Sequence, residues 1–170
     1  PALSRFFEAF QGAADDPTSI PQRQLLLTQS EGLVARFHSL NDRLNSQARN
    51  IELELDAAIS SINSLAQGLV QVNQAISLAS SSASGGNQPN QLLDERDEAL
   101  RQLSELVNVN AIDQDGTGQI NVFIGNGQPL VVGDTATLLT TPASARDTSK
   151  IDIALLVNGS QQVITNNLTG

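Results

Sequence analysis

Carboxylate side chains gather near the middle of the chain, at Asp94, Glu95, Asp97 and Glu98. Paired carboxylates are the groups that perform acid–base catalysis or hold a hard metal ion. Two cations, Arg96 and Arg101, interleave with them, and the four-residue spacing from Asp97 to Arg101 predicts an ion pair on one helix face. We therefore interpret the cluster as a helix start braced by solvated ion pairs, and not as an active site.

Other residues that could carry chemistry lack the partners that the chemistry needs. Residues 113–116 (Asp-Gln-Asp-Gly) resemble the start of a calcium loop, but the first and twelfth positions would be Ala111 and Val122, which are not ligands. The only histidine, His38, is a lone imidazole, and we expect it to be solvated. The Gly-Asn-Gly stretch at 125–127 precedes no helix, so it is not a phosphate loop. We expect no enzyme activity, no metal and no cofactor.

The composition of the chain limits its partners. Nine Lys and Arg residues against eighteen Asp and Glu residues give a net charge of −9 over 170 residues. Because such a chain repels phosphates and anionic lipid head groups, we expect it to bind neither nucleic acid nor a membrane. Cysteine is absent, which excludes disulfides and thiol chemistry. The sequence begins at Pro1 inside a helical pattern, so we expect an internal fragment of a longer protein.

One long apolar seam dominates the elements that would carry these residues. Steps of three and four residues connect positions from Leu26 to Ala79 that are all apolar except Ser30, and this period keeps one helix stripe facing a partner. The positions that we assign to helix packing are Leu33, Phe37, Leu40, Leu44, Ile51, Leu55, Ile62, Leu65, Leu69, Val72 and Ile76. A helix of about sixty residues would be on the order of 90 Å long. That length suits scaffolding better than it suits a binding pocket.

The first part of the chain is predicted to be a helical rod. Residues 1–108 contain a short helix, a long helix over about 19–82 and a return helix over about 90–107. The long helix begins at a capping box in residues 19–22. We predict an α+β fold, in which this long antiparallel helical rod precedes a small β-hairpin or meander region.

The remainder of the chain changes to a period of two residues, which is typical of strands. We predict a β-meander over residues 109–133, attached to the rod and containing a hairpin turn at Asp115-Gly116. Residues 134–150 are predicted to be a connector. Residues 151–170, with an Asn-Gly turn at 158–159, are predicted to start a truncated β-rich outer domain.

These lengths leave part of the seam without a partner. The return helix can cover only the last part of the rod, and the short first helix only the opposite end. The seam from about Phe37 to Ala58 has no partner in this chain. Long apolar stripes are seldom left in contact with water. We expect a helix from elsewhere in the protein, or from a neighbouring subunit, to lie along it.

Residues 3–11 (Leu-Ser-Arg-Phe-Phe-Glu-Ala-Phe-Gln) are similar to the start of the outer helical domain of the flagellar hook-associated protein 1 (FlgK) family. Further stretches resemble the same family in the same order. Residues 62–65 (Ile-Asn-Ser-Leu) and 72–76 (Val-Asn-Gln-Ala-Ile) resemble an Asn-containing helical stretch of that family. Residues 121–131 resemble its following hairpin.

The most specific resemblance lies in residues 89–97 (Pro-Asn-Gln-Leu-Leu-Asp-Glu-Arg-Asp), where Gln91 replaces the usual Asp. The family motif residues there are Asn90, Leu92, Leu93, Asp94, Arg96 and Asp97. We expect them to cap and brace the return helix. An alternative is that Arg96 ties this helix to the rod or to the loop at 84–89.

The resemblance implies a flagellin-like rod domain in a secreted, extracellular protein at the junction between flagellar hook and filament. It implies self-association in a ring, contact with the flagellar hook protein and a second hook-associated (junction) protein, and an export chaperone for the type III apparatus. It also implies a C-terminal helix that returns along the rod.

Other classes of protein share parts of this pattern. A type III secreted tip or translocator protein is also a long helical hairpin without Cys, but it would lack the short hairpins after residue 108. A signalling coiled coil would have flanking membrane spans. A polysaccharide-acting enzyme would need a converging carboxylate pair in the β region.

Overall fold

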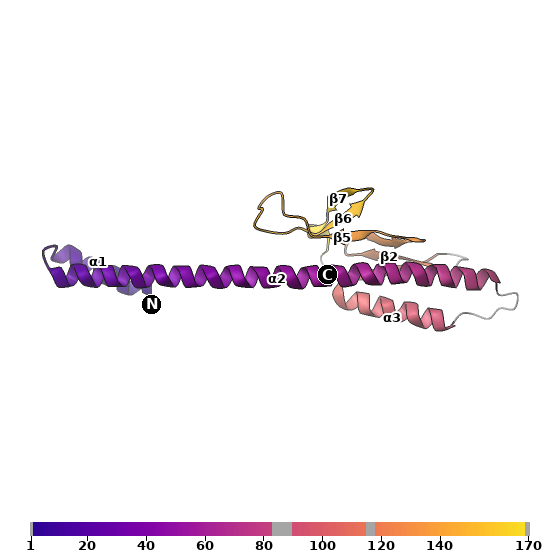
Figure 1. Ribbon diagram of the computed structural model, residues 1–170, viewed down its shortest axis with the longest axis horizontal. Helices are drawn as coiled ribbons and strands as arrows, with labels where there is room; N and C mark the ends of the chain where they lie inside the picture. Colours follow the sequence, from indigo (N-terminus) through magenta and orange to yellow (C-terminus); the bar gives the residue numbers. More distant parts are fainter. Residues whose placement is uncertain (1, 83–89, 115–117, 169–170) are drawn as a thin grey trace. The chain divides into compact units, whose positions relative to one another are not determined.

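The computed structural model describes residues 2–82, 90–114 and 118–168. These residues confirm the predicted α+β fold, because helices are followed by antiparallel strands (Figure 1). The helices are α1 (Ala2–Asp15), α2 (Ile20–Ser82) and α3 (Asn90–Leu106). The chain forms two compact units, an N-terminal unit of residues 1–52 and a C-terminal unit of residues 53–170. The turn predicted at Asp115-Gly116 and the loop at 84–89 lie outside the described residues.

The N-terminal unit consists of α1 and the first part of α2. A tight turn joins the two helices, in which the Asp16 amide donates to the Gly12 carbonyl (3.3 Å) and the Ser19 amide to the Asp16 carbonyl (3.2 Å). Among the described residues of this unit, only Ala9 and Ala13 are buried. The unit therefore lacks a core of large side chains.

The C-terminal unit holds the hydrophobic core. Six buried side chains of α2 recur at alternating steps of three and four residues: Ile59, Ile62, Ala66, Leu69, Asn73 and Ile76. The buried residues packed against this part of the helix come from α3, from the strands and from the residue that follows β7: Leu103, Ile120, Val122, Ile124, Leu130, Val131, Leu139, Leu155 and Ile164. Burial of this apolar surface is the main force that stabilises the unit.

Two small antiparallel sheets complete the C-terminal unit. The four-stranded sheet has the order β1-β2-β3-β4 and contains β1 (Val109–Asp113), β2 (Ile120–Ile124), β3 (Gln128–Val132) and β4 (Thr135–Ala136). The three-stranded sheet has the order β5-β6-β7 and contains β5 (Leu138–Thr140), β6 (Ala154–Val157) and β7 (Ser160–Val163). The 3-10 helix η1 (Thr165–Asn167) follows.

The hairpin between β6 and β7 has the predicted Asn-Gly turn. Val157 pairs with Ser160, so Asn158 and Gly159 form a two-residue loop. Their φ angles are 50° and 79°, and positive values at both positions are what a type I′ turn requires.

The β region differs from the prediction in two respects. We expected a connector over 134–150 and a meander that ends by residue 133, but β4 and β5 lie inside the expected connector. We also expected residues 151–170 to start a separate domain, but β6 pairs with β5 and Leu155 is buried in the common core. Strands of two or three residues depend on distant pairing partners, so local sequence signals them weakly.

Candidate functional site

The acidic cluster lies on the surface of α3, and its ion pairs differ from the predicted one. Asp97 does not pair with Arg101. It pairs with its neighbour Arg96 (3.1 Å). Arg101 instead pairs with Glu98 (2.7 Å) and with Glu105, at the i−3 and i+4 positions that a helix brings close.

Hydrogen bonds from Arg101 and from Gln102 lower the pKa of Glu98 from 4.5 to about 2. Among the described residues, no three His, Asp or Glu side chains are close enough together to hold a metal ion. The geometry of the cluster is that of a solvated ion-pair network.

The remaining candidates for chemistry serve turns and surfaces. His38 is exposed on α2. Gly125 stands in the turn between β2 and β3 with a φ of 53°, and a Cβ there would collide with the Asn167 carbonyl. The Asn126 amide donates to the same carbonyl (2.9 Å). This glycine-containing turn therefore packs against η1. Within the described residues, none of α1, α2 and α3 combines the length and the hydropathy that a membrane span requires.

The residues assigned to the seam divide between the two units. In the C-terminal unit, Ile62, Leu69, Val72 and Ile76 are buried, and Leu55 and Leu65 are half-buried. In the N-terminal unit, Leu33 is half-buried, and the following seam residues are exposed: Phe37 (59%), Leu40 (51%), Leu44 (58%) and Ile51 (58%). The exposed part of the seam thus extends from Phe37 to Ile51, whereas the expected stretch extended to Ala58, and Leu55 and Ala58 are half-buried.

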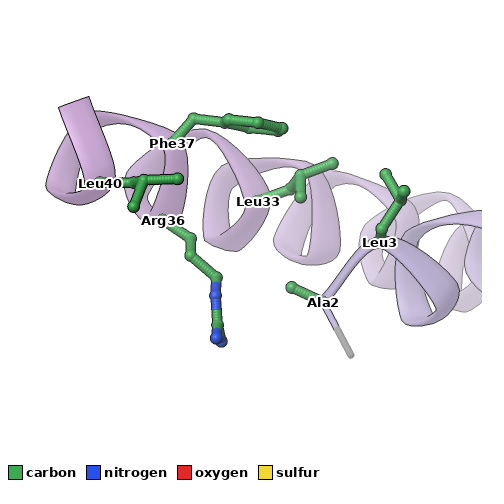
Figure 2. A pocket seen from close by; sticks show the side chains of 6 residues that line it. All are labelled: Ala2, Leu3, Leu33, Arg36, Phe37 and Leu40. Atoms are coloured by element: carbon green, nitrogen blue, oxygen red, sulfur yellow. The ribbon is translucent and has the colours of Figure 1, made fainter. Parts of the chain in front are cut away.

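A shallow pocket of about 240 Å³ opens at the start of this uncovered stretch. Figure 2 shows its walls: Ala2 and Leu3 come from α1, and Leu33, Phe37 and Leu40 from α2, with Arg36 at the edge. Both helices belong to the N-terminal unit. Leu3, Phe37 and Leu40 are exposed, so the pocket is open and does not have the form of an enclosed ligand site.

The family motif residues stand at the start of α3. Asn90 is its first residue, Leu92 and Leu93 are half-buried, and Asp94 and Asp97 are exposed. Leu92 lines a hollow between α3 and α2 that also includes Leu65, Gly68 and Val72.

The alternative role predicted for Arg96 was a tie to the long helix or to the loop at 84–89. The ion partner of Arg96 is Asp97, and that loop lies outside the described residues. The structure therefore gives Arg96 a local bracing contact.

Two asparagines that sequence reasoning did not select hold both sheets to α2. The Asn73 side chain, which is 0% exposed, donates to the Ile120 carbonyl (2.8 Å) and accepts from the Ile120 amide (3.2 Å). It also donates to the Gly133 carbonyl (3.4 Å). Since β3 ends at Val132, the Asn73 amide completes hydrogen bonding where the ladder between β2 and β3 has stopped.

Asn63 makes the equivalent pair of bonds to the three-stranded sheet. Its side chain donates to the Leu139 carbonyl (2.9 Å) and accepts from the Leu139 amide (2.8 Å). The strand β5 is at the edge of its sheet, so the Asn63 amide lies where a further strand would pair. The sequence held a signal for Asn73, because it stands four residues after Leu69 and three before Ile76, at the spacing of the seam.

Comparison with known proteins agrees with this architecture. A family described as "Flagellar hook-associated protein FlgK helical domain" matches residues 1–170. Flagellar hook-associated protein 1 of Escherichia coli (strain K12) is 33% identical over 152 residues, which cover 89% of this chain and 27% of that protein. The protein of the same name from Salmonella typhimurium is 31% identical over 153 residues, with coverages of 90% and 27%.

A solved structure of the flagellar hook junction protein FlgK from Burkholderia pseudomallei superposes with a TM-score of 0.81 at 31% identity. The superposition covers 94% of this chain and 27% of that one. The chain thus spans little more than a quarter of the length of these relatives. Because the family match extends over residues 1–170, the chain belongs to the FlgK helical-domain family of flagellar hook-associated proteins.

Proposed function

We propose that this chain is a structural, non-enzymatic part of a protein that joins the flagellar hook to the filament and is needed for filament assembly and motility. The family match and the names of the relatives support this role. The observation that carries the proposal is the exposed seam from Phe37 to Ile51 in a chain that matches this family throughout.

The proposed mechanism is mechanical. A helix from the rest of the protein, or from a neighbouring subunit, covers the exposed seam and completes the rod. The relatives are more than three times as long as this chain, since the matched part of it covers only 27% of them, so they have ample sequence for such a helix. The completed subunits then associate in a ring that passes load from hook to filament.

The partners of this assembly are, in the same proposal, further copies of the protein, the hook protein, a second hook-associated (junction) protein and an export chaperone. The location is extracellular, on the flagellum, after type III export of the unfolded chain. Neither nucleic acid nor a membrane is a partner, because the net charge of −9 opposes both.

Replacement of the exposed seam in the full-length protein tests the proposal. A strain without the gene should keep its hooks but lose attached filaments and swimming, and the natural gene should restore both. A Phe37→Glu/Leu44→Glu variant should fail to restore them, because two carboxylates would replace apolar contacts along the seam.

A matched control uses the opposite face of the same helix. Ser39 and Ser46 have the same seven-residue spacing and line a polar hollow, so Ser39→Glu/Ser46→Glu should restore swimming. Immunoblots of the culture medium distinguish failed export from failed assembly. Normal swimming of the deletion strain, or full rescue by Phe37→Glu/Leu44→Glu, would contradict the proposal.

A further inference from the structure

One edge of the exposed seam is basic. Arg36 and Arg43 each stand immediately before a seam residue, Phe37 and Leu44. Their separation of seven residues is close to two helical turns, so both arginines lie on the same flank of the apolar stripe. Figure 2 shows Arg36 extending from α2 beside the pocket that Leu33 helps to form.

These arginines have no acidic partner in the N-terminal unit. Within the part of the chain that the structure describes, neither Arg36 nor Arg43 forms an ion pair. Further seven-residue steps along the same flank reach Gln29 and Asn50, which are uncharged. The flank therefore has two arginines without a carboxylate at ion-pair distance, although Asp42 lines the same hollow as Arg43.

Beside the seam residues from Leu33 to Leu44 the opposite flank is neutral, and the acidic residue that follows on it is Glu52, next to Ile51. Seven-residue steps along it connect Val34, Asn41 and Ala48. Residues on the two flanks of an apolar helix seam contact the flanking residues of the partner helix, and their charges set partner choice. The two edges of the exposed seam therefore differ in charge.

We propose that the stripe formed by Leu33, Phe37, Leu40 and Leu44 accepts an amphipathic helix with carboxylates at seven-residue spacing along the edge that faces Arg36 and Arg43. This inference rests on the proposed function, in which a helix covers the seam, and adds the chemistry by which that helix is selected. Complementary charge at the edge of a helix interface sets specificity and alignment more than it sets affinity.

A second copy of the same stripe is a poorer occupant. Antiparallel pairing of two copies would place Arg36 and Arg43 of one copy against the same residues of the other. Like charges placed in this way oppose association. The basic edge therefore favours a different, acidic helix over self-pairing.

Two synthetic peptides test the inference. Both are 28-residue amphipathic helices with the same apolar positions, and all flanking positions are Glu in one and Lys in the other. Each is titrated into the 170-residue chain, and the Kd is measured by fluorescence anisotropy. The Glu peptide should bind about tenfold more tightly in dilute salt, although the chain as a whole carries a charge of −9. The preference should fade in 1 M NaCl.

Charge reversal of the edge provides the matched comparison. Arg36→Glu/Arg43→Glu should reverse the preference, while circular dichroism should show unchanged helix content. Of the single variants, Arg43→Glu should weaken binding of the Glu peptide more than Arg49→Glu, because Arg49 donates to Ser46 (3.2 Å) on the polar face.

Equal affinities, a preference for the Lys peptide, or no binding of either peptide would overturn the inference. Self-association of the chain through this stripe, detected by sedimentation, would overturn it as well. If both peptides bind equally well and Phe37→Glu/Leu44→Glu abolishes their binding, the proposed charge preference is wrong. The proposal that a helix covers the seam would still stand. The swimming assay decides the flagellar role independently of all these results.

Discussion

The helix α2 extends the same kind of apolar seam through both units, but only the C-terminal unit covers it. Leu44 in the N-terminal unit is 58% exposed, whereas Leu69 in the C-terminal unit is 0% exposed. The chain after α2 returns as α3 and two sheets, which pack against the second stretch. The spacing of apolar residues therefore shows that one face of a helix must be covered. Which segment covers that face depends on the tertiary fold of the rest of the chain.

The units differ equally in their polar contacts. The C-terminal unit buries Asn73 with two hydrogen bonds to the backbone of Ile120 in β2 and one to the carbonyl of Gly133, just after β3. The only buried residues in the described part of the N-terminal unit are Ala9 and Ala13. We infer that the C-terminal unit folds from its own contacts, whereas the N-terminal unit gains most of its stability from a partner.

Hydrogen exchange of the isolated chain should show the largest difference. Backbone amides of residues 59–76 should exchange at least about a hundredfold more slowly than those of residues 33–51, because only the former need the core to open. Mass spectrometry of peptic fragments measures both segments in one sample. Equal protection would mean that the N-terminal unit is stable by itself and would remove the contrast.

Truncation of one leucine in each unit should give the next largest difference between the two units. Leu69→Ala should lower the free energy of unfolding by about 3 kcal/mol, since it leaves a cavity in a closed core. Leu44→Ala should change it by less than about 0.5 kcal/mol in the isolated chain. Urea unfolding followed by circular dichroism measures both variants, and a similar loss for the two would show that Leu44 is already packed.

Removal of the buried amide should have a somewhat smaller effect. Asn73→Ala leaves the Ile120 amide and carbonyl without partners, which should cost about 2 kcal/mol of unfolding free energy. The adjacent exposed residue supplies the control, and Gln74→Ala should be nearly neutral. Equal stability of the two variants, again by urea unfolding, would show that the sheet does not need this bond.

The surface ion pairs should matter least. Because the pKa of Glu98 is lowered from 4.5 to about 2, its carboxylate stabilises the fold above pH 4.5, and this contribution disappears as the pH falls towards 2. Glu98→Gln should therefore be slightly less stable than the natural chain at pH 6 and equally stable near pH 2. If the stability difference between the natural chain and Glu98→Gln persists at pH 2, or if 1 M NaCl leaves it unchanged at pH 6, the difference does not come from the ion pair.

Features set by local chemistry could be predicted from the sequence. The long helix was expected over about 19–82 and spans Ile20–Ser82, and the return helix was expected over about 90–107 and spans Asn90–Leu106. Polar and glycine residues beside apolar periods are sufficient to mark such ends. The Asn-Gly turn at 158–159 needs only two residues that tolerate positive φ.

Features set by distant contacts could not be predicted in this way. The short strand β5 exists because Leu139 enters a core made by α2 and by Leu155 of β6. Arg101 forms ion pairs with Glu98 and Glu105 and not with Asp97. All three carboxylates stand at helical spacing from Arg101, so the sequence does not decide among them. The roles of Asn63 and Asn73 depend on strands that lie 76 and 47 residues further along the chain.

The placement of Asn63 also bears on misassembly. A strand edge with free amides and carbonyls is a template on which other chains can stack into aggregates. The Asn63 side chain pairs with the Leu139 amide and carbonyl, so these groups at the outer edge of β5 cannot pair with another chain. Because the closing group belongs to a helix, β5 becomes protected only once α2 has formed and docked, so a polypeptide that emerges unfolded is safest when its helix forms before its sheets.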